Sequence, residues 1–394
     1  MRIALVDASP LKSITLYPLP LLKLGAWRKS LGDECVIFSG KLPTLGAFDE
    51  IWLTTRFTYD IPFAVGMAKA ARERAGRVWV GGISATLLPE YFEREGLEVH
   101  RGLLPDAEKF SPDYSLLSER PAYSISHTSR GCIRKCGFCM VSKLEPTFKN
   151  RDGWENDLHP STHKVLFYDN NWLAKELEDF RADVDKLRGL VADGRITKID
   201  FNQGLDARLV TDEIANLLQG LPIKPVRFAF DGMHEDGHYQ RAVEMMAARG
   251  FREFMTYVLY NFKDTPKDFY YRLRESVRLT QELPVNYVGS FPMRYQPILE
   301  ADRGRSFVGK HWTTTAKKGF MNILQIQSLS GQVTCAGGHF DSKLQEFEYW
   351  FGKTADEFDR LLSYPHIRDL MKRKKGALRM RRARGFGITP TRLG

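Results

Sequence analysis

The sequence predicts an α/β protein with a doubly wound parallel sheet at its N-terminus. A partial (β/α)6 TIM-type barrel follows, and then a small, mostly helical C-terminal region. Two observations predict the sheet regions: strand-like and helix-like segments alternate over residues 1–105, and again as six units over 121–300. A third observation predicts the last region, because this alternation stops after residue 301, where Gly-rich segments flank an apolar stretch.

Short apolar runs predict the strands of the first sheet, and segments with apolar residues at helical spacing predict the helices between them. The strands are expected at Arg2–Val6, Glu34–Phe38, Glu50–Thr55, Arg77–Val80 and Val99–Leu103. The helices are expected at Leu19–Ser30, which Gly32 stops, and at Pro62–Ala75. In such a sheet, ligands bind at the carboxyl ends of the strands.

The barrel is predicted from the same alternation. Its strands are expected at Ser124–Thr128, Lys164–Tyr168, Lys198–Asn202, Val226–Phe230, Glu253–Tyr260 and Val285–Ser290. Its helices are expected at Leu173–Leu190, Thr211–Leu218, Asp236–Arg249 and Thr265–Glu282. Thr211 and Thr265 are typical helix caps, each followed by Pro or early acids.

The C-terminal region contains an apolar stretch, Phe320–Ile326, and two amphipathic segments, Lys343–Phe351 and Ala355–Leu362, which predict a helical cap. We therefore expect four parts: an α/β domain over 1–110, the barrel over 111–300, the cap over 301–371 and a basic tail over 372–394.

Charge is concentrated at the C-terminus. The chain has 394 residues and a net charge of +10, from 58 Lys and Arg against 48 Asp and Glu. Nine of the basic residues and no acid lie within 372–394, so the rest of the chain is close to neutral. A basic tail can bind phosphates through counterion release, dock an acidic partner, or remain a solvated end.

The sequence shows no membrane span and no signal peptide, so we expect a cytoplasmic protein that does not enter a membrane. Five cysteines in 394 residues are too few, and odd in number, for a disulfide framework.

Three of the five cysteines, Cys132, Cys136 and Cys139, follow the spacing C-x3-C-x2-C. Thiolates select iron-sulfur clusters or zinc. A [4Fe-4S] cube usually takes four cysteines, so three leave one iron open to another ligand. The alternative is a zinc site completed by His127 or His163.

The segment from Ser129 through Cys139 resembles the signature of the radical S-adenosylmethionine (SAM) superfamily. The resemblance implies a [4Fe-4S] cluster on Cys132, Cys136 and Cys139, with SAM bound at the open iron. It also implies reductive cleavage of SAM to a 5′-deoxyadenosyl radical that abstracts hydrogen from a substrate, with a flavodoxin- or ferredoxin-type protein as electron donor.

By the same resemblance, several other residues would contact SAM. They are Phe138 against the adenine, Asp169 and Asn170 near the amino group, Gln203 near the ribose, Arg208 near the carboxylate, and Asp231 and Tyr257 on later strands. For Arg208 the alternative is a buried ion pair with Asp206. For Asp231 the alternative is a helix cap.

Residues 1–110 resemble the cobalamin (B12)-binding-type domain that precedes many radical SAM cores. The resemblance rests on the segments 17–28, 81–90 and 112–114. A corrin would lie near Thr54, Thr55 and Tyr59. The Asp-x-His-x-x-Gly signature is absent, so two interpretations stay open: a cobalamin site, or a wall of the substrate cleft.

Cobalamin would favour methyl transfer, whereas without it the reaction would be a rearrangement, cyclisation or oxidation. Cys335, in Thr334-Cys335-Ala336-Gly337, is the candidate for a catalytic residue that meets a radical; its alternative is an inert side chain. The substrate stays open among a small molecule, a peptide and a nucleic acid. The remote alternative is a zinc-stabilised nucleic-acid-binding protein. Because only Cys35 lies upstream of the motif, a methylthiotransferase with a second cluster is disfavoured.

Overall fold

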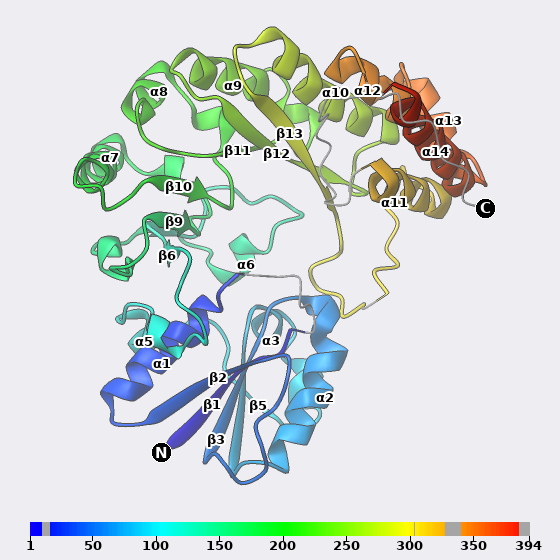
Figure 1. The fold of residues 1–394 in the computed structure, drawn as a ribbon. Helices are drawn as coiled ribbons and strands as arrows, with labels where there is room; N and C mark the ends of the chain where they lie inside the picture. Colours follow the sequence, from blue (N-terminus) through cyan, green and yellow to red (C-terminus); the bar gives the residue numbers. More distant parts are fainter. Residues whose placement is uncertain (10–15, 303, 328–339, 386–394) are drawn as a thin grey trace, which may run out of the picture. The chain divides into compact units, whose positions relative to one another are not determined.

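In a computed structural model of the chain, residues 1–9, 16–302, 304–327 and 340–385 are described, with side chains up to residue 380 (Figure 1). They form two compact units: residues 1–203 with 296–307, and residues 204–295 with 308–394. The chain passes from the first unit to the second after residue 203. The domain boundaries expected from the sequence stay predictions. The two units are described separately below. No described helix is long and apolar enough to cross a bilayer.

The first unit begins with a five-stranded parallel sheet in the order β2-β1-β3-β4-β5. Its strands are β1 (Arg2–Asp7), β2 (Glu34–Ser39), β3 (Glu50–Thr55), β4 (Arg77–Gly82) and β5 (Glu98–Val99). The helices around them are α1 (Leu19–Ser30), α2 (Ile61–Arg72), α3 (Ile83–Leu87), α4 (Glu90–Glu93) and α5 (Pro105–Glu108). This order is one of the two common doubly wound arrangements, with its switch point between β1 and β3.

Alternate residues of β1 are buried on opposite faces of this sheet. Ile3 and Leu5 pack with Leu21 of α1, whereas Ala4 and Val6 lie in a second cluster with Ala64 and other residues of α2. Both faces are therefore covered by helices, which explains why the strand is a continuous apolar run. The predicted doubly wound sheet is confirmed, and Cys35 lies in its core, 8% exposed.

A second parallel sheet in this unit has the order β10-β9-β6. Its strands are β6 (Ser124–Ser126), β9 (Lys164–Phe167) and β10 (Lys198–Phe201), and α7 (Leu177–Ala192) follows β9. The two tryptophans Trp154 and Trp172 both donate to Asp183 of α7, at 3.1 and 2.9 Å. These bonds tie the helix to the aromatic residues next to the sheet.

The second unit contains the parallel sheet β11-β12-β13 and the helices that follow its strands. The strands are β11 (Val226–Ala229), β12 (Glu253–Tyr260) and β13 (Tyr287–Arg294), and the helices are α8 (Asp212–Leu218), α9 (His238–Ala248) and α10 (Pro266–Glu282). Thr211 and Thr265 cap α8 and α10 as predicted, with hydrogen bonds of 3.2 and 3.1 Å.

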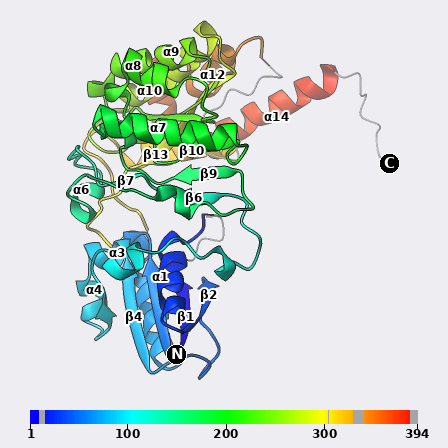
Figure 2. The same cartoon turned by 90° about the vertical axis from the view of Figure 1, so that its left-hand side faces the viewer.

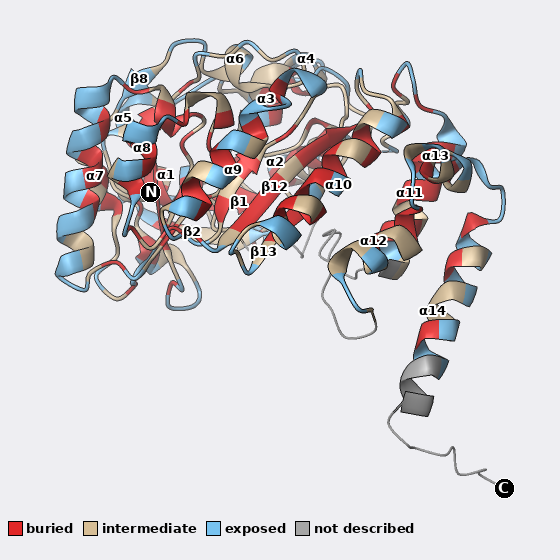
Figure 3. Cartoon of the chain, turned by 90° about the horizontal axis from the view of Figure 1, so that it is seen from above, coloured by how far each residue is buried: buried red, intermediate tan, exposed pale blue. Residues whose placement is uncertain are grey.

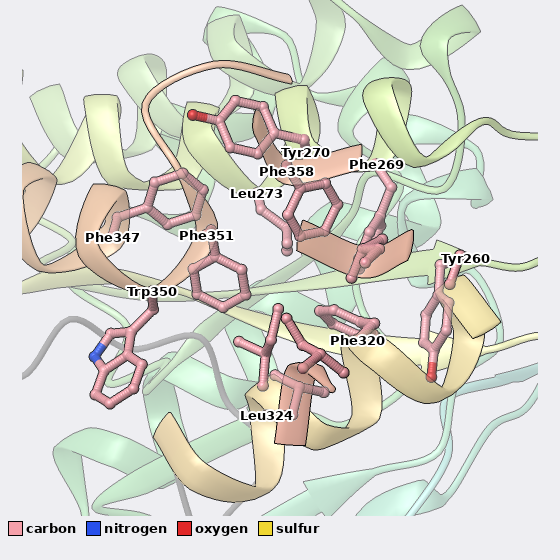
Figure 4. Packing of buried hydrophobic residues seen from close by; sticks show 14 of the residues in the cluster. Tyr260, Phe269, Tyr270, Leu273, Phe320, Leu324, Phe347, Trp350, Phe351 and Phe358 are labelled. Carbon is pink, nitrogen blue, oxygen red and sulfur yellow. The ribbon is translucent and has the colours of Figure 1, made fainter. Parts of the chain in front are cut away.

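Four helices complete this unit: α11 (Thr314–Gln327), α12 (Lys343–Phe351), α13 (Ala355–Ser363) and α14 (Ile367–Gly385). Their apolar side chains pack on α10 in one cluster that is rich in aromatic rings (Figure 4). Phe320 of α11 and Phe358 of α13 both contact Phe269 of α10, at ring distances of 4.8 and 6.4 Å. The predicted mostly helical C-terminal region is confirmed, and α14 runs through residue 372, where the basic tail was expected to begin.

Two predicted strands differ from the observed ones by more than two residues at one end. The strand expected at Val99–Leu103 is only Glu98–Val99, because Gly102 has φ +81° and turns the chain away from β4. The strand expected at Val285–Ser290 is β13, which keeps its register with β12 as far as Arg294. Pro292 within it is tolerated because β13 is an edge strand, so its missing N–H breaks no ladder.

Candidate cluster-binding site

The three cysteines lie in the loop between β7 (Ser129–Arg130) and α6 (Val141–Leu144). The Cys139 N–H donates to the Cys136 carbonyl at 3.0 Å, which closes a tight turn, and all three thiols are partly exposed. Among the described residues, no three His, Cys, Asp or Glu side chains lie close enough to hold one metal ion. That finding concerns single-ion sites. A cube binds each thiolate at a different iron, so the sulfurs stand farther apart.

Gly131 begins the loop in a conformation that other residues rarely adopt. Its φ is +75°, and an added Cβ would lie 2.3 Å from the Thr147 carbonyl oxygen and 3.0 Å from that of Glu145. The backbone after α6 therefore passes directly against the start of the cysteine loop. Only glycine allows this close approach.

Glu145, six residues after the last cysteine, holds the loop at three points. Its carboxylate accepts from the Gly131 N–H at 2.9 Å, from Arg130 Nη1 at 2.5 Å and from Asn170 Nδ2 at 3.0 Å. Arg130 in turn donates to Glu108 of α5 at 2.6 Å. The carboxylate thus connects the loop to the end of β9 and, through Arg130, to the segment that precedes the second sheet.

Two N–H groups point at the Cys132 sulfur: the Arg134 backbone N–H at 3.3 Å and Asn171 Nδ2 at 3.6 Å. Hydrogen bonds to a thiolate sulfur stabilise its negative charge, and around a cluster they tune its potential. Asn171 is 3% exposed and lies just beyond the carboxyl end of β9. The predicted SAM contacts were Asp169 and Asn170 of the same strand-end run, and nothing in the sequence ranks these three residues.

Asp169 is buried and makes four hydrogen bonds with the segment that leads to the loop. Its oxygens accept from the Thr128 N–H at 3.1 and 2.9 Å, from Thr128 Oγ1 at 2.8 Å and from Ser129 Oγ at 2.6 Å. Burial raises the pKa of this carboxyl, against the effect of these donors. In this arrangement Asp169 fixes the backbone before the cysteines. Its predicted contact with SAM stays a prediction.

The other predicted contacts in this unit lie where their strands end. Phe138 is half-buried within the cysteine loop, and Asn170 faces Glu145. Gln203 is exposed, and the preceding residue, Asn202, still donates its N–H to the Phe167 carbonyl at 3.1 Å. The structure therefore brings Phe138, Asn170 and the cysteines to neighbouring segments of one unit.

Arg208, Asp231 and Tyr257 belong to the second unit. Arg208 Nε and Nη2 donate to the Asp206 carboxylate at 2.7 and 3.1 Å, so the ion pair named as the alternative is formed. Arg208 Nη1 also lies 3.6 Å from Glu235. The pair leaves the prediction of a carboxylate ligand for Arg208 untested.

Asp231 follows β11 and forms hydrogen bonds through both its side chain and its backbone. Its Oδ1 accepts from the Leu259 N–H at 3.1 Å, and its own N–H donates to Glu235 Oε2 at 2.5 Å. Burial, and then the neighbouring carboxylate of Glu235, raises the pKa of Asp231 to about 7. Gly232, and not Asp231, is the cap of the short helix that follows.

Tyr257 lies on β12 with its ring against Gly204, whose φ is +87° and whose added Cβ would lie 3.5 Å from that ring. It meets Phe291 of β13 edge to face, with 6.0 Å between ring centroids. Tyr260, by contrast, is 1% exposed within the helical core (Figure 4). The positive φ of Gly204, and not a lack of space beside the ring, is what favours glycine at this position.

Arg272 of α10 is a buried cation that the sequence analysis missed. It is 0% exposed; Nη1 donates to the carbonyls of Phe230 and Leu259, each at 2.8 Å, and Nη2 to Asp264 at 2.8 Å. It thereby joins the carboxyl ends of β11 and β12. The available signal was its position three residues after Phe269, on the apolar face of a predicted helix.

Cys335, the candidate catalytic residue, lies outside the described residues, and its predicted role stays a prediction.

The carboxyl edge of the first sheet is also polar. Asp7 at the end of β1 pairs with Arg56 after β3, and Thr55 Oγ1 joins the Gly81 carbonyl at 3.0 Å to the Ala85 N–H at 3.1 Å. Within the described part of the chain, the buried atoms near this edge that have no hydrogen-bond partner include Ser9 Oγ, Ser84 Oγ and His100 Nε2. The ring of Tyr59 stacks on Phe57 with 5.0 Å between centroids.

Comparisons with known proteins place the fold. No protein-family profile matches the chain, and no curated protein sequence matches it. Solved structures do match it, and two of them are of TsrM, a radical S-adenosylmethionine methyltransferase from Kitasatospora setae. The one with cobalamin and a [4Fe-4S] cluster bound has a TM-score of 0.55 and 13% identity over 77% of each chain.

The other TsrM structure, with its tryptophan substrate and the SAM analogue aza-SAM, has a TM-score of 0.53 and 13% identity. It covers 76% of this chain and 75% of that one. Identity this low establishes the fold alone. The chain therefore shares the mixed α/β fold with parallel sheets of these enzymes, as the alternation of strand-like and helix-like segments predicted.

Proposed function

We propose that this protein is a radical SAM enzyme that transfers a methyl group with the help of cobalamin. The observation that carries the proposal is the cysteine loop: three partly exposed thiols follow a Gly131 turn that no other residue fits, at one end of a parallel sheet. The shared fold supports it, since one TsrM structure with that fold holds a [4Fe-4S] cluster and cobalamin. We further infer that β6 and β9–β13 make up the predicted partial barrel.

The residues present fit a cluster. Three thiolates would bind three of its irons, and two N–H groups already point at one of the sulfurs. With SAM at the open iron, such a cluster supplies a 5′-deoxyadenosyl radical. The chain's own part is to hold the loop through Glu145, to present Phe138 as an apolar face, and to place Asn170 at the strand end beside it.

The residues present also fit cobalamin. Orphaned buried atoms such as Ser84 Oγ and His100 Nε2 are typical of an edge that receives a polar ligand, and β1, β3 and β4 end there. Gly82 lets the ends of β3 and β4 lie close together at this edge, because an added Cβ would lie 2.5 Å from the Thr55 carbonyl oxygen. Bound cobalamin would supply methyl transfer. The residues around it would orient the corrin and exclude water.

A flavodoxin- or ferredoxin-type protein is our proposal for the electron donor, since the cluster must be reduced in each reaction. The substrate is proposed only as a molecule with an unactivated C–H bond.

Metal analysis after purification without oxygen tests the function. We expect three to four iron and sulfide per chain, broad absorption near 400 nm, and about one cobalt after reconstitution with cobalamin. Iron without cobalt would favour the rearrangement, cyclisation or oxidation class. One zinc per colourless chain would contradict the proposal and favour the zinc-stabilised alternative.

A further inference from the structure

The last described helix, α14, has two different faces. Ile367, Met371 and Leu378 are buried in the core cluster shared with α10–α13. Lys374, on the same side, donates to the Tyr349 carbonyl. Figures 2 and 3 show α14 extending from the other helices of its unit towards the C-terminus.

Four cations form a stripe beside the buried face: Arg368, Lys372, Lys375 and Arg379. Their spacing of i, i+4, i+7 and i+11 keeps them within about 60° of the helix circumference and spreads them over about 16 Å. Three of the four are exposed and Lys375 is half-exposed. Among the described residues, no ion pair is recorded for any of them. We call this set the α14 stripe.

We propose that the α14 stripe binds the phosphate backbone of a double-stranded nucleic acid. The choice of a duplex follows from the arrangement of the four cations in one row along the helix. A duplex strand presents a regular row of phosphates, and four cations in one row along a helix can face it. Backbone cations position a nucleic acid without reading its sequence.

Other anionic partners fit less well. A helix that binds a membrane surface inserts its apolar face, and here that face is already packed in the core. An interface with a folded protein has apolar and aromatic residues at its centre, whereas the α14 stripe consists of cations only. Single strands are bound by stacking bases on aromatic rings, and residues 367–380 include none. A duplex backbone needs neither.

The inference does not depend on the proposed function, since it concerns one helix of the second unit. On the same protein, a binding assay therefore tests this inference and a SAM-cleavage assay tests the proposed function, and either one can be contradicted without the other.

The test uses the full-length protein and a short fluorescent RNA duplex, with a DNA duplex of the same sequence, the RNA single strand and anionic lipid vesicles as further arms. Anisotropy is measured over a range of salt concentrations. If four phosphates are neutralised, log K should fall with log salt at a slope of about −3 to −4. Binding of either duplex at this slope supports the proposal. The duplex that binds more tightly, RNA or DNA, identifies the nucleic acid.

The variant Lys372→Gln/Lys375→Gln/Arg379→Gln should reduce the slope to about −1 and weaken duplex binding at least tenfold. The control Lys310→Gln/Lys318→Gln/Lys353→Gln removes the same charge from exposed lysines elsewhere in the unit and should bind as the parent does. Thermal melts should show all three proteins folded. If the triple stripe variant is unstable, Lys372→Gln alone should still lower the slope by about one.

Four results would overturn the proposal: no duplex binding by the parent, an unchanged slope in the stripe variant, equal losses in both triple variants, or tighter binding to vesicles or the single strand than to either duplex.

Discussion

Replacing Gly131 by Ala should destroy the cluster site without unfolding the protein. The substitution meets two costs. A non-glycine residue at φ +75° costs about 1–2 kcal/mol. The new Cβ would also lie 2.3 Å from the Thr147 carbonyl oxygen, so the backbone must shift, at a further ~1–3 kcal/mol. The strain falls on the segment that begins the cysteine loop.

Gly194 supplies the matched control. It has φ +68°, close to that of Gly131, but an added Cβ there meets nothing within 4 Å. Gly194→Ala should therefore show the conformational cost alone and keep its cluster. The assay is iron and sulfide content with absorption near 400 nm after anaerobic reconstitution. We expect Gly131→Ala to lose most of its iron. Parental iron content in Gly131→Ala would refute the reasoning about this turn.

Three further outcomes follow from the same contacts. Glu145→Gln removes the charge that holds Arg130 and should release iron to a chelator severalfold faster than the parent, whereas equal rates would mean that the carboxylate does not hold the loop. Arg272→Met leaves two strand-end carbonyls and Asp264 without their donor. It should lower the unfolding free energy by about 3–5 kcal/mol in denaturant titrations, and a loss below about 1 kcal/mol would contradict its role in joining β11 and β12. Because Asp231 has a pKa of about 7 in the folded state and an ordinary value near 4 when unfolded, the folded state binds more protons between these values. The contribution of Asp231 to stability should therefore be present below pH 4 and be lost as pH rises to 7. Asp231→Asn should gain stability relative to the parent over that interval, and parallel pH profiles would speak against this.

Patterns within single segments were predicted well, because they depend on local periodicity and turn chemistry. Helices Leu19–Ser30 and Lys343–Phe351 and strand Glu253–Tyr260 have the predicted bounds.

Contacts between distant segments were not predicted. Glu145 reaches back to Gly131 and across to Asn170, and Arg272 reaches two strand ends from a helix. Such contacts depend on how the chain folds back on itself, and a single sequence carries no record of it. For the same reason the sequence could name Asp206 with Arg208 as a possible pair, since those residues are neighbours, but could not choose between their roles.

Formation of 5′-deoxyadenosine from SAM by the reduced, reconstituted protein tests the central claim most directly. The parent should produce it, and Cys132→Ala, Cys136→Ala and Cys139→Ala should each produce none above background. Cys35→Ala, which changes a buried cysteine in the first sheet, should retain the activity. If a variant lacking one of the three loop cysteines still makes 5′-deoxyadenosine at the parental rate, the account of this site is wrong.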